Sequence, residues 1–163
     1  MNRLAAEIIE ILNEDARRTP EQIAGMLGSE AEKVETLIRQ LEQEKVILRY
    51  KAVVDQEKVD HEKVQALIEV RLTPQRDMGF DSLAKRIYRF DEVQSVYLMS
   101  GSFDLMVMVE GRSMKQVALF VAEKLSVLEG VLSTATHFVL RKYKEDGVVI
   151  AGQEKDSRLV VTP

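Results

Sequence analysis

Residues 97–111 read YLMSGSFDLMVMVEG, and this stretch decides how the second half of the chain is expected to fold. Two runs of strand-forming residues flank Ser100, Gly101 and Ser102, as in a tight β-hairpin. The second run contains one acid, Asp104. Because a carboxylate is costly to bury unless donors satisfy it, we expect Asp104 either to cap the hairpin turn or to contact a ligand.

The residues on either side of the hairpin predict a βαββαβ unit. Apolar residues alternate with polar ones in the expected strands and recur at helical spacing in the expected helices. The predicted elements are strand 64–72, helix 80–87, strands 93–100 and 103–110, helix 114–128 and strand 131–141. This order predicts a ferredoxin-like fold, in which two helices cover one face of a four-stranded antiparallel sheet.

The hairpin is expected to be apolar on both faces of this sheet. Tyr97, Met99, Met106 and Met108 occupy alternate positions, and the positions between them are also largely apolar. Two helices cover only one face, and a large apolar patch rarely stays exposed on a soluble monomer. We therefore expect a second copy of the chain to cover the other face. We interpret the methionines as core or interface residues rather than as a cofactor site.

Three short helices are predicted in the first 45 residues. A Thr-Pro-Glu-Gln sequence at 19–22 caps the second helix, which ends at Gly28, and Ser29 is expected to cap the third. Helices with this spacing, and a glycine between the second and third, match a helix-turn-helix unit. The β-rich residues 46–55 predict a short wing that continues as a linker strand. The fold class is thus α+β, with a winged helix-turn-helix ahead of the ferredoxin-like domain. A three-helix dimerisation or capping bundle is the alternative for the first part.

Charge argues against strong binding of a polyanion by these helices. Residues 1–50 carry seven basic and ten acidic side chains. Glu30, Glu32 and Glu35 open the third helix, where acids favour the helix dipole but repel phosphates in major-groove docking. If the unit binds DNA, the expected contacts are Lys33, Thr36, Arg39 and Gln40 on the third helix, Arg49 and Lys51 on the wing, and Arg17 and Arg18 before the second helix.

The whole chain has the composition of a globular protein, with 163 residues, 45% hydrophobic and 31% charged, a net charge of −4 and no cysteine. The lack of cysteine excludes disulfides and thiolate ligands and is typical of a reducing cytoplasm. No stretch approaches the roughly 20 apolar residues of a transmembrane helix, so we expect a cytoplasmic protein with no membrane partner. His61 and His137 are far apart, and no catalytic motif is present. We therefore expect neither an enzyme nor a metal or cofactor site.

The order of the elements and two local motifs resemble a known family. Residues 37–47 read LIRQLEQEKVI at the end of the helix-turn-helix, and residues 100–105 read SGSFDL at the hairpin. Over nearly the whole chain, this arrangement resembles the Lrp/AsnC, or feast/famine, transcriptional regulators. The resemblance implies a regulator that binds double-stranded DNA, forms homodimers through its carboxy-terminal sheets and assembles further into tetramers or octamers. It also implies an amino acid or related small effector bound between subunits.

The same resemblance implies which residues bind the effector. The glycine and the acid of the family's hairpin fall on Gly101 and Asp104, and further contacts come from the hairpin and the hydroxyl-bearing part of the last strand. An amino acid needs an acceptor for its ammonium group and donors for its carboxylate, and Asp104 and the amides and hydroxyls around it are of these types. The expected set is Leu98, Met99, Ser100, Gly101, Ser102, Asp104, Met106, Ser133, Thr134 and Thr136.

The third helix departs from the family pattern. Family recognition helices usually open with Ser-Pro-Ser-Thr and carry consecutive arginines further on, whereas the matching positions here are 30–33, Glu-Ala-Glu-Lys, and 36–37, Thr-Leu. The glycine that usually precedes the wing is Lys45. An alternative function is therefore an amino-acid-binding oligomer that acts through protein partners, with weak or lost DNA binding.

These patterns divide the chain into four segments. We expect a helix-turn-helix DNA-binding domain at 1–50, a linker strand and hinge at 51–63, an effector-binding and oligomerisation domain at 64–145, and a tail at 146–163. The tail holds two short apolar runs, 148–150 and 159–161, around a polar turn. These runs are expected either to pair as a hairpin or to add to an edge of the sheet.

Overall fold

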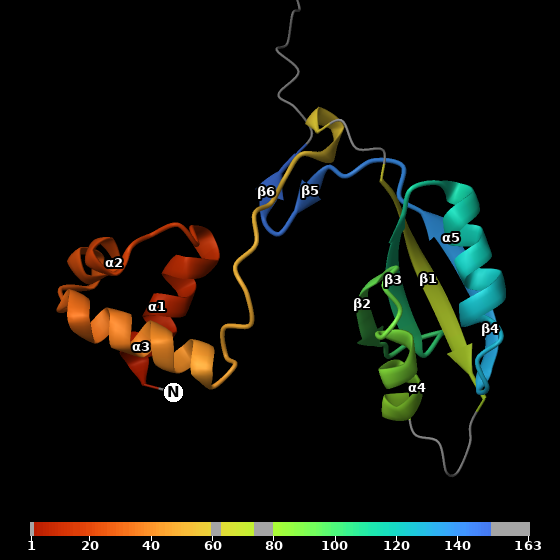
Figure 1. Ribbon diagram of the computed structural model, residues 1–163, viewed down its shortest axis with the longest axis horizontal. Coiled ribbons are helices and arrows are strands. Elements are labelled where there is room, and N and C mark those ends of the chain that lie inside the picture. The colour runs from red at the N-terminus through yellow and green to blue at the C-terminus, as the bar shows by residue number, and fades with distance from the viewer. Residues whose placement is uncertain (1, 60–62, 74–79, 151–163) are drawn as a thin grey trace, which may run out of the picture. The chain divides into compact units, whose positions relative to one another are not determined.

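The computed structural model describes residues 2–59, 63–73 and 80–150 of the chain. The chain forms two compact units, which divide between Val53 and Val54 (Figure 1). The first unit is helical, and the second contains a four-stranded sheet. Among the described residues, no helix combines the length and the apolar character that a membrane crossing requires.

Three helices form the first unit: α1 (Arg3–Glu14), α2 (Pro20–Leu27) and α3 (Ala31–Gln43). Thr19 caps α2, since its Oγ1 accepts the N–H of Gln22 at 3.3 Å and the Gln22 Oε1 accepts the N–H of Thr19 at 3.0 Å. Gly28 ends α2 with a φ of 61°, a left-handed conformation that favours glycine. The buried core of this unit consists of Ile8, Leu12, Ile23, Ala24 and Val34.

The third helix and the residues after it differ from two predictions. Glu30, not Ser29, occupies the N-cap of α3, and its side chain makes no capping bond. Residues 46–55 contain no strand, and the N–H of Val46 donates to the Leu41 carbonyl at 2.9 Å to close the end of α3. Strand backbone needs a neighbouring strand for its hydrogen bonds, and the described part of the helical unit has none. The described residues 46–59 therefore contain neither the predicted wing nor a linker strand, and a single turn of 3₁₀-helix, η1 (Gln56–Lys58), follows the extended segment.

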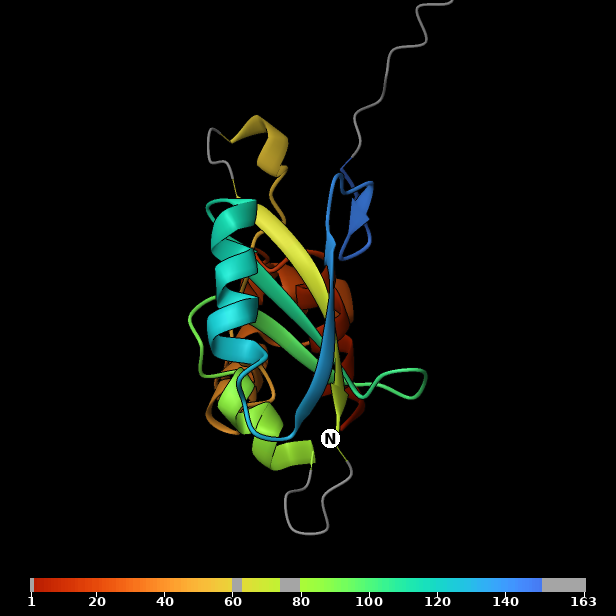
Figure 2. The same ribbon diagram turned by 90° about the vertical axis from the view of Figure 1, so that its right-hand side faces the viewer.

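The second unit has the predicted βαββαβ order (Figure 1). Its elements are β1 (Val64–Leu72), α4 (Phe80–Ile87), β2 (Val93–Leu98), β3 (Leu105–Gly111), α5 (Met114–Phe120), its π-helical continuation η2 (Val121–Leu125), and β4 (Val131–Phe138). The strands pair antiparallel in the order β2-β3-β1-β4. Figure 2 shows α4 and α5 on the same face of the sheet. This arrangement confirms the ferredoxin-like fold.

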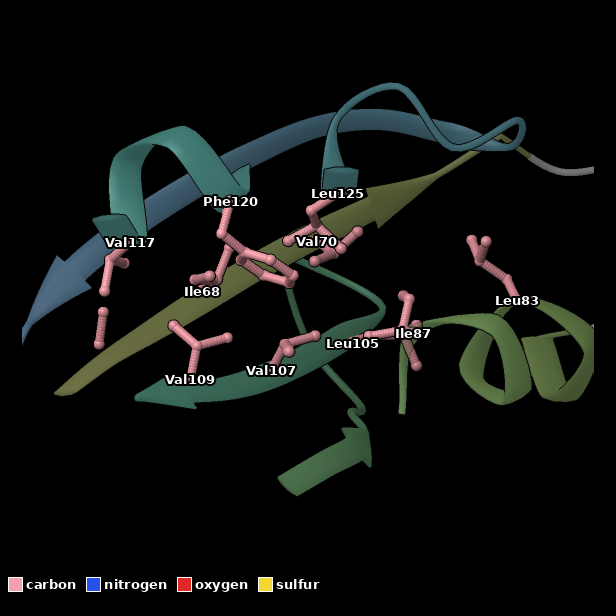
Figure 3. Close-up of a cluster of buried hydrophobic side chains, with 11 residues drawn as sticks. Ile68, Val70, Leu83, Ile87, Leu105, Val107, Val109, Val117, Phe120 and Leu125 are labelled. Carbon is pink, nitrogen blue, oxygen red and sulfur yellow. The ribbon is translucent and has the colours of Figure 1, made fainter. Parts of the chain in front are cut away.

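The core of the second unit lies between the sheet and its helices (Figure 3). Alternate residues of β1 and β3 point to the helices, so that Ile68 lies opposite Val107 and Val70 lies opposite Leu105. All four side chains are buried. The helices contribute Leu83 and Ile87 from α4, Val117 and Phe120 from α5, and Leu125 from η2. This core determines which residues of each strand face away from the helices.

The hairpin and the last helix are less regular than predicted. The strand β2 ends at Leu98 and β3 begins at Leu105, so a loop over residues 99–104 replaces the expected tight turn. The helix predicted over 114–128 changes from α to π geometry after Phe120. The loop leaves the buried faces of β2 and β3 as predicted, because it lies outside the paired residues.

The end of the described chain forms a small separate hairpin. The strand β4 ends at Phe138, earlier than the predicted residue 141, and β5 (Lys144–Glu145) pairs with β6 (Val148–Val149). The first apolar run of the tail therefore pairs with residues just before it and not with an edge of the four-stranded sheet. The second run, 159–161, and the hinge residues 60–62 lie outside the described residues.

The face of the sheet away from the helices carries a central apolar strip. Met106 and Met108 of β3 lie there, and Tyr97 of β2 pairs with Met106. Leu67 of β1 pairs with Met108 and extends the strip to the next strand. Met99, which was expected to share this face, lies beyond the end of β2 in the loop. The open face is therefore apolar along its centre.

Candidate functional site

The hairpin acid, Asp104, joins three segments of the second unit. Its Oδ2 accepts the backbone N–H of Leu72 at 2.7 Å, and its own N–H donates to the carbonyl of Val70 at 3.0 Å. Its carbonyl accepts the N–H of Met99 at 2.8 Å. Leu72 and Val70 belong to β1, whereas Met99 follows β2. Asp104 therefore ties the hairpin loop to the end of the neighbouring strand.

The strand register explains why Leu72 needs this acceptor. The β1–β3 ladder ends at the pair of Val70 and Leu105, and the β1–β4 register shifts between Arg71 and Leu72. The N–H of Leu72 lies beyond the last regular pair with β3, so the Asp104 carboxylate takes the place of a strand carbonyl. The carboxylate of Asp104 therefore caps the neighbouring strand rather than the hairpin turn, and its expected contact with a ligand stays a prediction.

Strand alternation distributes the other expected effector residues over two faces of the sheet. Leu98, Thr134 and Thr136 lie on the helix-covered face, and Met106 and Ser133 lie on the open face. The loop residues Met99, Ser100, Gly101 and Ser102 are exposed. The expected set therefore does not form one continuous surface within one chain.

These residues nevertheless share one end of the sheet. Val70 of β1 pairs with Leu105 of β3 on one side and with Thr134 of β4 on the other. Because β1 stands between β3 and β4, Asp104 and Thr134 are two strand spacings apart, roughly 10 Å. Asp104 and the hydroxyl of Thr134 thus lie at the same end of the sheet, with β1 between them.

Ser126 is a neighbour of this region that sequence reasoning missed. Its Oγ lies 3.3 Å from the Oγ1 of Thr134. The N–H of Ser126 donates to the carbonyl of Val121 at 2.8 Å, the i→i+5 bond of a π-helix. The π-helical turn thus sets Ser126 beside the last strand. Apolar periodicity alone does not signal such a turn, so the sequence offered no direct indication of this contact.

The expected DNA contacts on α3 are largely engaged by neighbouring glutamates. Arg39 forms an ion pair with Glu35, and the Gln40 Nε2 donates to the Glu44 Oε1 at 2.7 Å. The hydroxyl of Thr36 donates to the backbone carbonyl of Glu32 at 2.8 Å. Lys33 is also exposed on this helix. The helix therefore presents a mixed charged face in which its acids compete with phosphates for the basic groups.

The other expected DNA contacts lie outside the helices of the same unit. Arg17 and Arg18 lie between α1 and α2, where Asp15 accepts the N–H of Arg17 at 3.0 Å and pairs with the Arg18 Nε at 3.3 Å. Arg49 and Lys51 are exposed in the extended segment after α3. The basic groups are therefore spread over three parts of the unit.

The backbone at Lys45 explains one departure from the family pattern. Lys45 adopts a φ of 57°, in the left-handed region that costs most residues about 1–2 kcal/mol relative to glycine. The family usually carries a glycine here. The turn after α3 is therefore left-handed in this chain even though a lysine occupies it.

Tyr50 anchors the extended segment to α3, and its ionisation tests that contact. Its hydroxyl donates to the Glu42 Oε1 at 2.9 Å. Burial, followed by this hydrogen bond and the charge of Glu42, raises the pKa of Tyr50 to about 12. The pKa of Tyr50 is thus higher in the folded protein than in the unfolded chain. Neutral Tyr50 therefore stabilises the fold below the ordinary pKa of about 10, and this stabilisation is lost as pH rises through 12.

We predict that Glu42→Gln lowers the pKa of Tyr50 towards its ordinary value. Ultraviolet absorbance of tyrosinate against pH measures the change, and Tyr50→Phe identifies which of the four tyrosines is responsible. Glu7→Gln in α1 is a matched control, since that glutamate pairs with Arg3 and leaves Tyr50 untouched. A titration curve that Glu42→Gln does not alter would contradict the contact.

Comparison with known proteins identifies the second unit. Residues 65–149 match the family model described as the Lrp/AsnC ligand binding domain. Over 158 residues, the chain is 54% identical to YugG of Bacillus subtilis (strain 168), described as an uncharacterized HTH-type transcriptional regulator. That match covers 96% of this chain and 95% of the relative.

Solved structures share the fold. The regulator NMB0573 of Neisseria meningitidis, solved as a complex with L-Met, matches with a TM-score of 0.70 and 23% identity over 89% of this chain and 93% of that chain. The AsnC structure of E. coli matches with a TM-score of 0.68 and 21% identity over 89% of this chain and 95% of that chain. At these identities, the structures establish the fold alone.

The family match and the relative agree with the arrangement of a helix-turn-helix unit followed by a ferredoxin-like unit. The relatives are transcriptional regulators rather than enzymes, which agrees with the expectation of a non-enzymatic function. The family model covers more than half of the chain, and the identity with the Bacillus relative extends over nearly all of it. The chain belongs to the Lrp/AsnC family of transcriptional regulators.

Proposed function

We propose that this protein is a cytoplasmic DNA-binding transcriptional regulator whose second unit forms homodimers and binds an amino acid or a related small effector. The observation that carries the proposal is the combination of two units in one chain. One has a helix-turn-helix arrangement with Gly28 in its turn, and the other matches the family's ligand binding domain. The 54% identity with an HTH-type regulator supports the DNA-binding part.

For the helical unit, α3 is the proposed recognition helix. Lys33 and Arg39 supply its positive charge, and Glu35 beside Arg39 weakens the attraction to phosphates. A dimer or larger oligomer carries several such units. Because linking weak sites multiplies their overall affinity, tetramers or octamers are the proposed form that binds double-stranded DNA.

Selection of genomic fragments with the purified protein, followed by a gel-shift assay at about 50 mM salt, tests DNA binding. A selected fragment is expected to shift, and the shift is expected to weaken steeply as salt rises, because phosphate contacts release counterions. If no selected fragment shifts even at this ionic strength, the DNA-binding part of the proposal is wrong.

We predict that Glu35→Gln strengthens binding to a selected fragment by about two- to fivefold. The change frees Arg39 from its ion pair and removes one negative charge from α3. Fluorescence anisotropy measures the Kd. Glu10→Gln is the matched control, because Glu10 is an exposed glutamate on α1. An equal gain in both variants would assign the effect to net charge alone, and no gain in Glu35→Gln would contradict the proposed role of α3.

The acidic start of α3 favours a second candidate function. In that function, the protein is an amino-acid-binding oligomer that acts through protein partners. Replacement of Glu30, Glu32 and Glu35 with lysine separates the two candidates. If the original protein fails to bind DNA in the gel shift but the lysine variant binds, the second function is the correct one.

For the second unit, we propose Asp104 as the acceptor for the effector's ammonium group. Asp104 and Thr134 are two strand spacings apart within one chain, so the acid of one subunit and the hydroxyls of another are proposed to meet across a subunit boundary. A solved structure that shares this fold is a complex with L-Met. Methionine is therefore the first probe in a thermal-shift comparison of the standard amino acids.

We propose that a second copy of the chain covers the open face of the sheet. The strip of Leu67, Met106 and Met108 supplies apolar contacts, and polar pairs flank it, among them the Glu69 Oε1 and the His137 Nε2 at 3.2 Å. Apolar contact framed by polar residues is typical of a homodimer interface. Light scattering after size-exclusion chromatography measures the assembly, and a monomer at micromolar concentration would contradict it.

A further inference from the structure

An ion pair borders the apolar strip on the open face of the sheet. Glu69 of β1 lies between Met106 of β3 and Ala135 of β4, two residues after Leu67. The Glu69 Oε1 is 3.2 Å from the Nε2 of His137 on β4. The side chain of Glu69 is 31% exposed and that of His137 is 58% exposed. Water therefore reaches both members of this pair, the Glu69–His137 pair, in the single chain.

A second copy of the chain over the open face removes water from this pair. The inference therefore rests on the homodimer of the proposed function. A carboxylate that loses its water is costly unless a cation neutralises it. Histidine can supply that cation, because its ring ordinarily changes charge near pH 6.5. The covered pair is thus most stable when His137 is protonated and the pair as a whole is neutral.

The other charged or titratable groups around the pair do not replace this proton. On the described strands and the segments beside them, these groups are Arg71 on β1, Tyr97 on β2, Asp104 and Glu110 at the ends of β3, Lys63 before β1, and Lys142 and Glu145 after β4. Lys63 and Lys142 form ion pairs of 2.6 Å with Glu110 and Glu145 respectively. Phenols such as that of Tyr97 ordinarily ionise near pH 10.

Arg71 is the remaining cation on this face. It lies two residues beyond Glu69 on β1, roughly 7 Å along the strand. No ion pair or hydrogen bond joins Arg71 to Glu69 in the described structure. Because β4 is an edge strand, no further strand lies beside His137 to supply another charge. Within one chain, the carboxylate of Glu69 therefore has His137 as its neighbouring cation.

We propose that the Glu69–His137 pair is a pH-sensitive switch of assembly, in which homodimer formation takes up protons at His137. Symmetry repeats the pair in both subunits, so each subunit takes up as much as one proton. The protonated pair stabilises the homodimer below about pH 6.5, where histidine is ordinarily protonated. This stabilisation is lost as pH rises, because a neutral His137 leaves the covered carboxylate uncompensated.

Fluorescence-detected sedimentation of the full-length protein, diluted to nanomolar concentrations, measures the dissociation constant at about pH 6 and about pH 8. At constant ionic strength, the constant is expected to be roughly 10- to 100-fold larger at the higher pH. His137→Gln keeps a polar side chain that does not titrate, and its constant is expected to be equal at the two pH values. His61→Gln replaces the other histidine of the chain and is the matched control, which is expected to keep the change.

Glu69→Gln tests the carboxylate of the pair. Without a negative charge at this position, a protonated His137 becomes an unpaired cation in the interface. The direction of the pH dependence is therefore expected to reverse, so that this homodimer dissociates more readily at the lower pH. A merely added or removed surface charge would change the dissociation constant without reversing its dependence on pH.

The same measurements decide between the switch and the homodimer on which it rests. The switch is overturned if the original homodimer has the same dissociation constant at both pH values, or if His137→Gln keeps the change. It is also overturned if His61→Gln abolishes the change, or if Glu69→Gln keeps its original direction. A homodimer that does not respond to pH leaves the proposed function intact, whereas a monomer at both pH values contradicts the homodimer as well.

Discussion

Asp104→Asn is expected to abolish the thermal shift that the effector produces while leaving the stability of the free protein nearly unchanged. The asparagine Oδ1 can still accept the N–H of Leu72, which Asp104 accepts at 2.7 Å. It carries no charge for the ammonium group of an amino acid. Hydrogen bonds to charged groups contribute about 1.5–3 kcal/mol, so the effector's affinity is expected to fall by roughly 10- to 100-fold.

Asp104→Ala separates the structural role of this residue from its binding role. The alanine leaves the N–H of Leu72 without its acceptor, and we expect the free energy of unfolding to fall by about 1–3 kcal/mol. Chemical denaturation measures this change, and Asp91→Ala at an exposed position before β2 is the control.

The variants Asp104→Asn, Asp104→Ala and Asp91→Ala together test whether Asp104 belongs to the effector site and how it supports the fold. An unchanged effector response in Asp104→Asn would remove Asp104 from the effector site. An equal loss of stability in Asp104→Asn and Asp104→Ala would show that the charge of Asp104, rather than its capacity to accept the Leu72 amide, supports the fold.

Met108→Lys is expected to dissociate the homodimer into folded monomers. Met108 lies on the open face opposite Leu67, at the centre of the apolar strip. In a dimer with this face at its interface, symmetry places the new ammonium group in the interface twice. Desolvating an unpaired charge costs several kcal/mol. The dissociation constant of the homodimer is therefore expected to rise by at least about 100-fold. In the monomer, the long lysine side chain reaches solvent and the fold is retained.

Light scattering at several protein concentrations measures this dissociation, and circular dichroism checks the fold. Met26→Lys is the matched control, because Met26 is a half-exposed methionine on α2 in the helical unit. If Met108→Lys keeps the mass of the original assembly, the open face is not the interface. If both lysine variants dissociate equally, the effect belongs to added charge and not to this face.

Much of the fold was predictable because its signals are local. The alternation in β1 and the helical spacing in α3 each follow from side chains within a few residues, and the capping box at Thr19 and Gln22 spans one turn. The predictions failed where the local signal was incomplete. The β-rich residues 46–55 have high strand propensity, but a strand also requires a partner, and none of the described strands pairs with them.

The candidate site was predictable only in part. The hairpin and its acid were recognisable from the quoted stretch, but alternation places Thr134 and Ser133 on opposite faces, which residue type does not reveal. Ser126 reaches Thr134 only through a π-helical turn.

The sequence by itself determined the order of the elements, the division into two units and the presence of an acid in the hairpin, because periodicity, caps and turn residues act between near neighbours. Only the tertiary structure decided what that acid meets. Leu72 and Asp104 are 32 positions apart, and the Leu72 amide lacks a strand carbonyl only because the β1–β3 ladder ends before it and the β1–β4 register shifts beside it. Register is a property of paired strands, so no single segment of the chain encodes this contact.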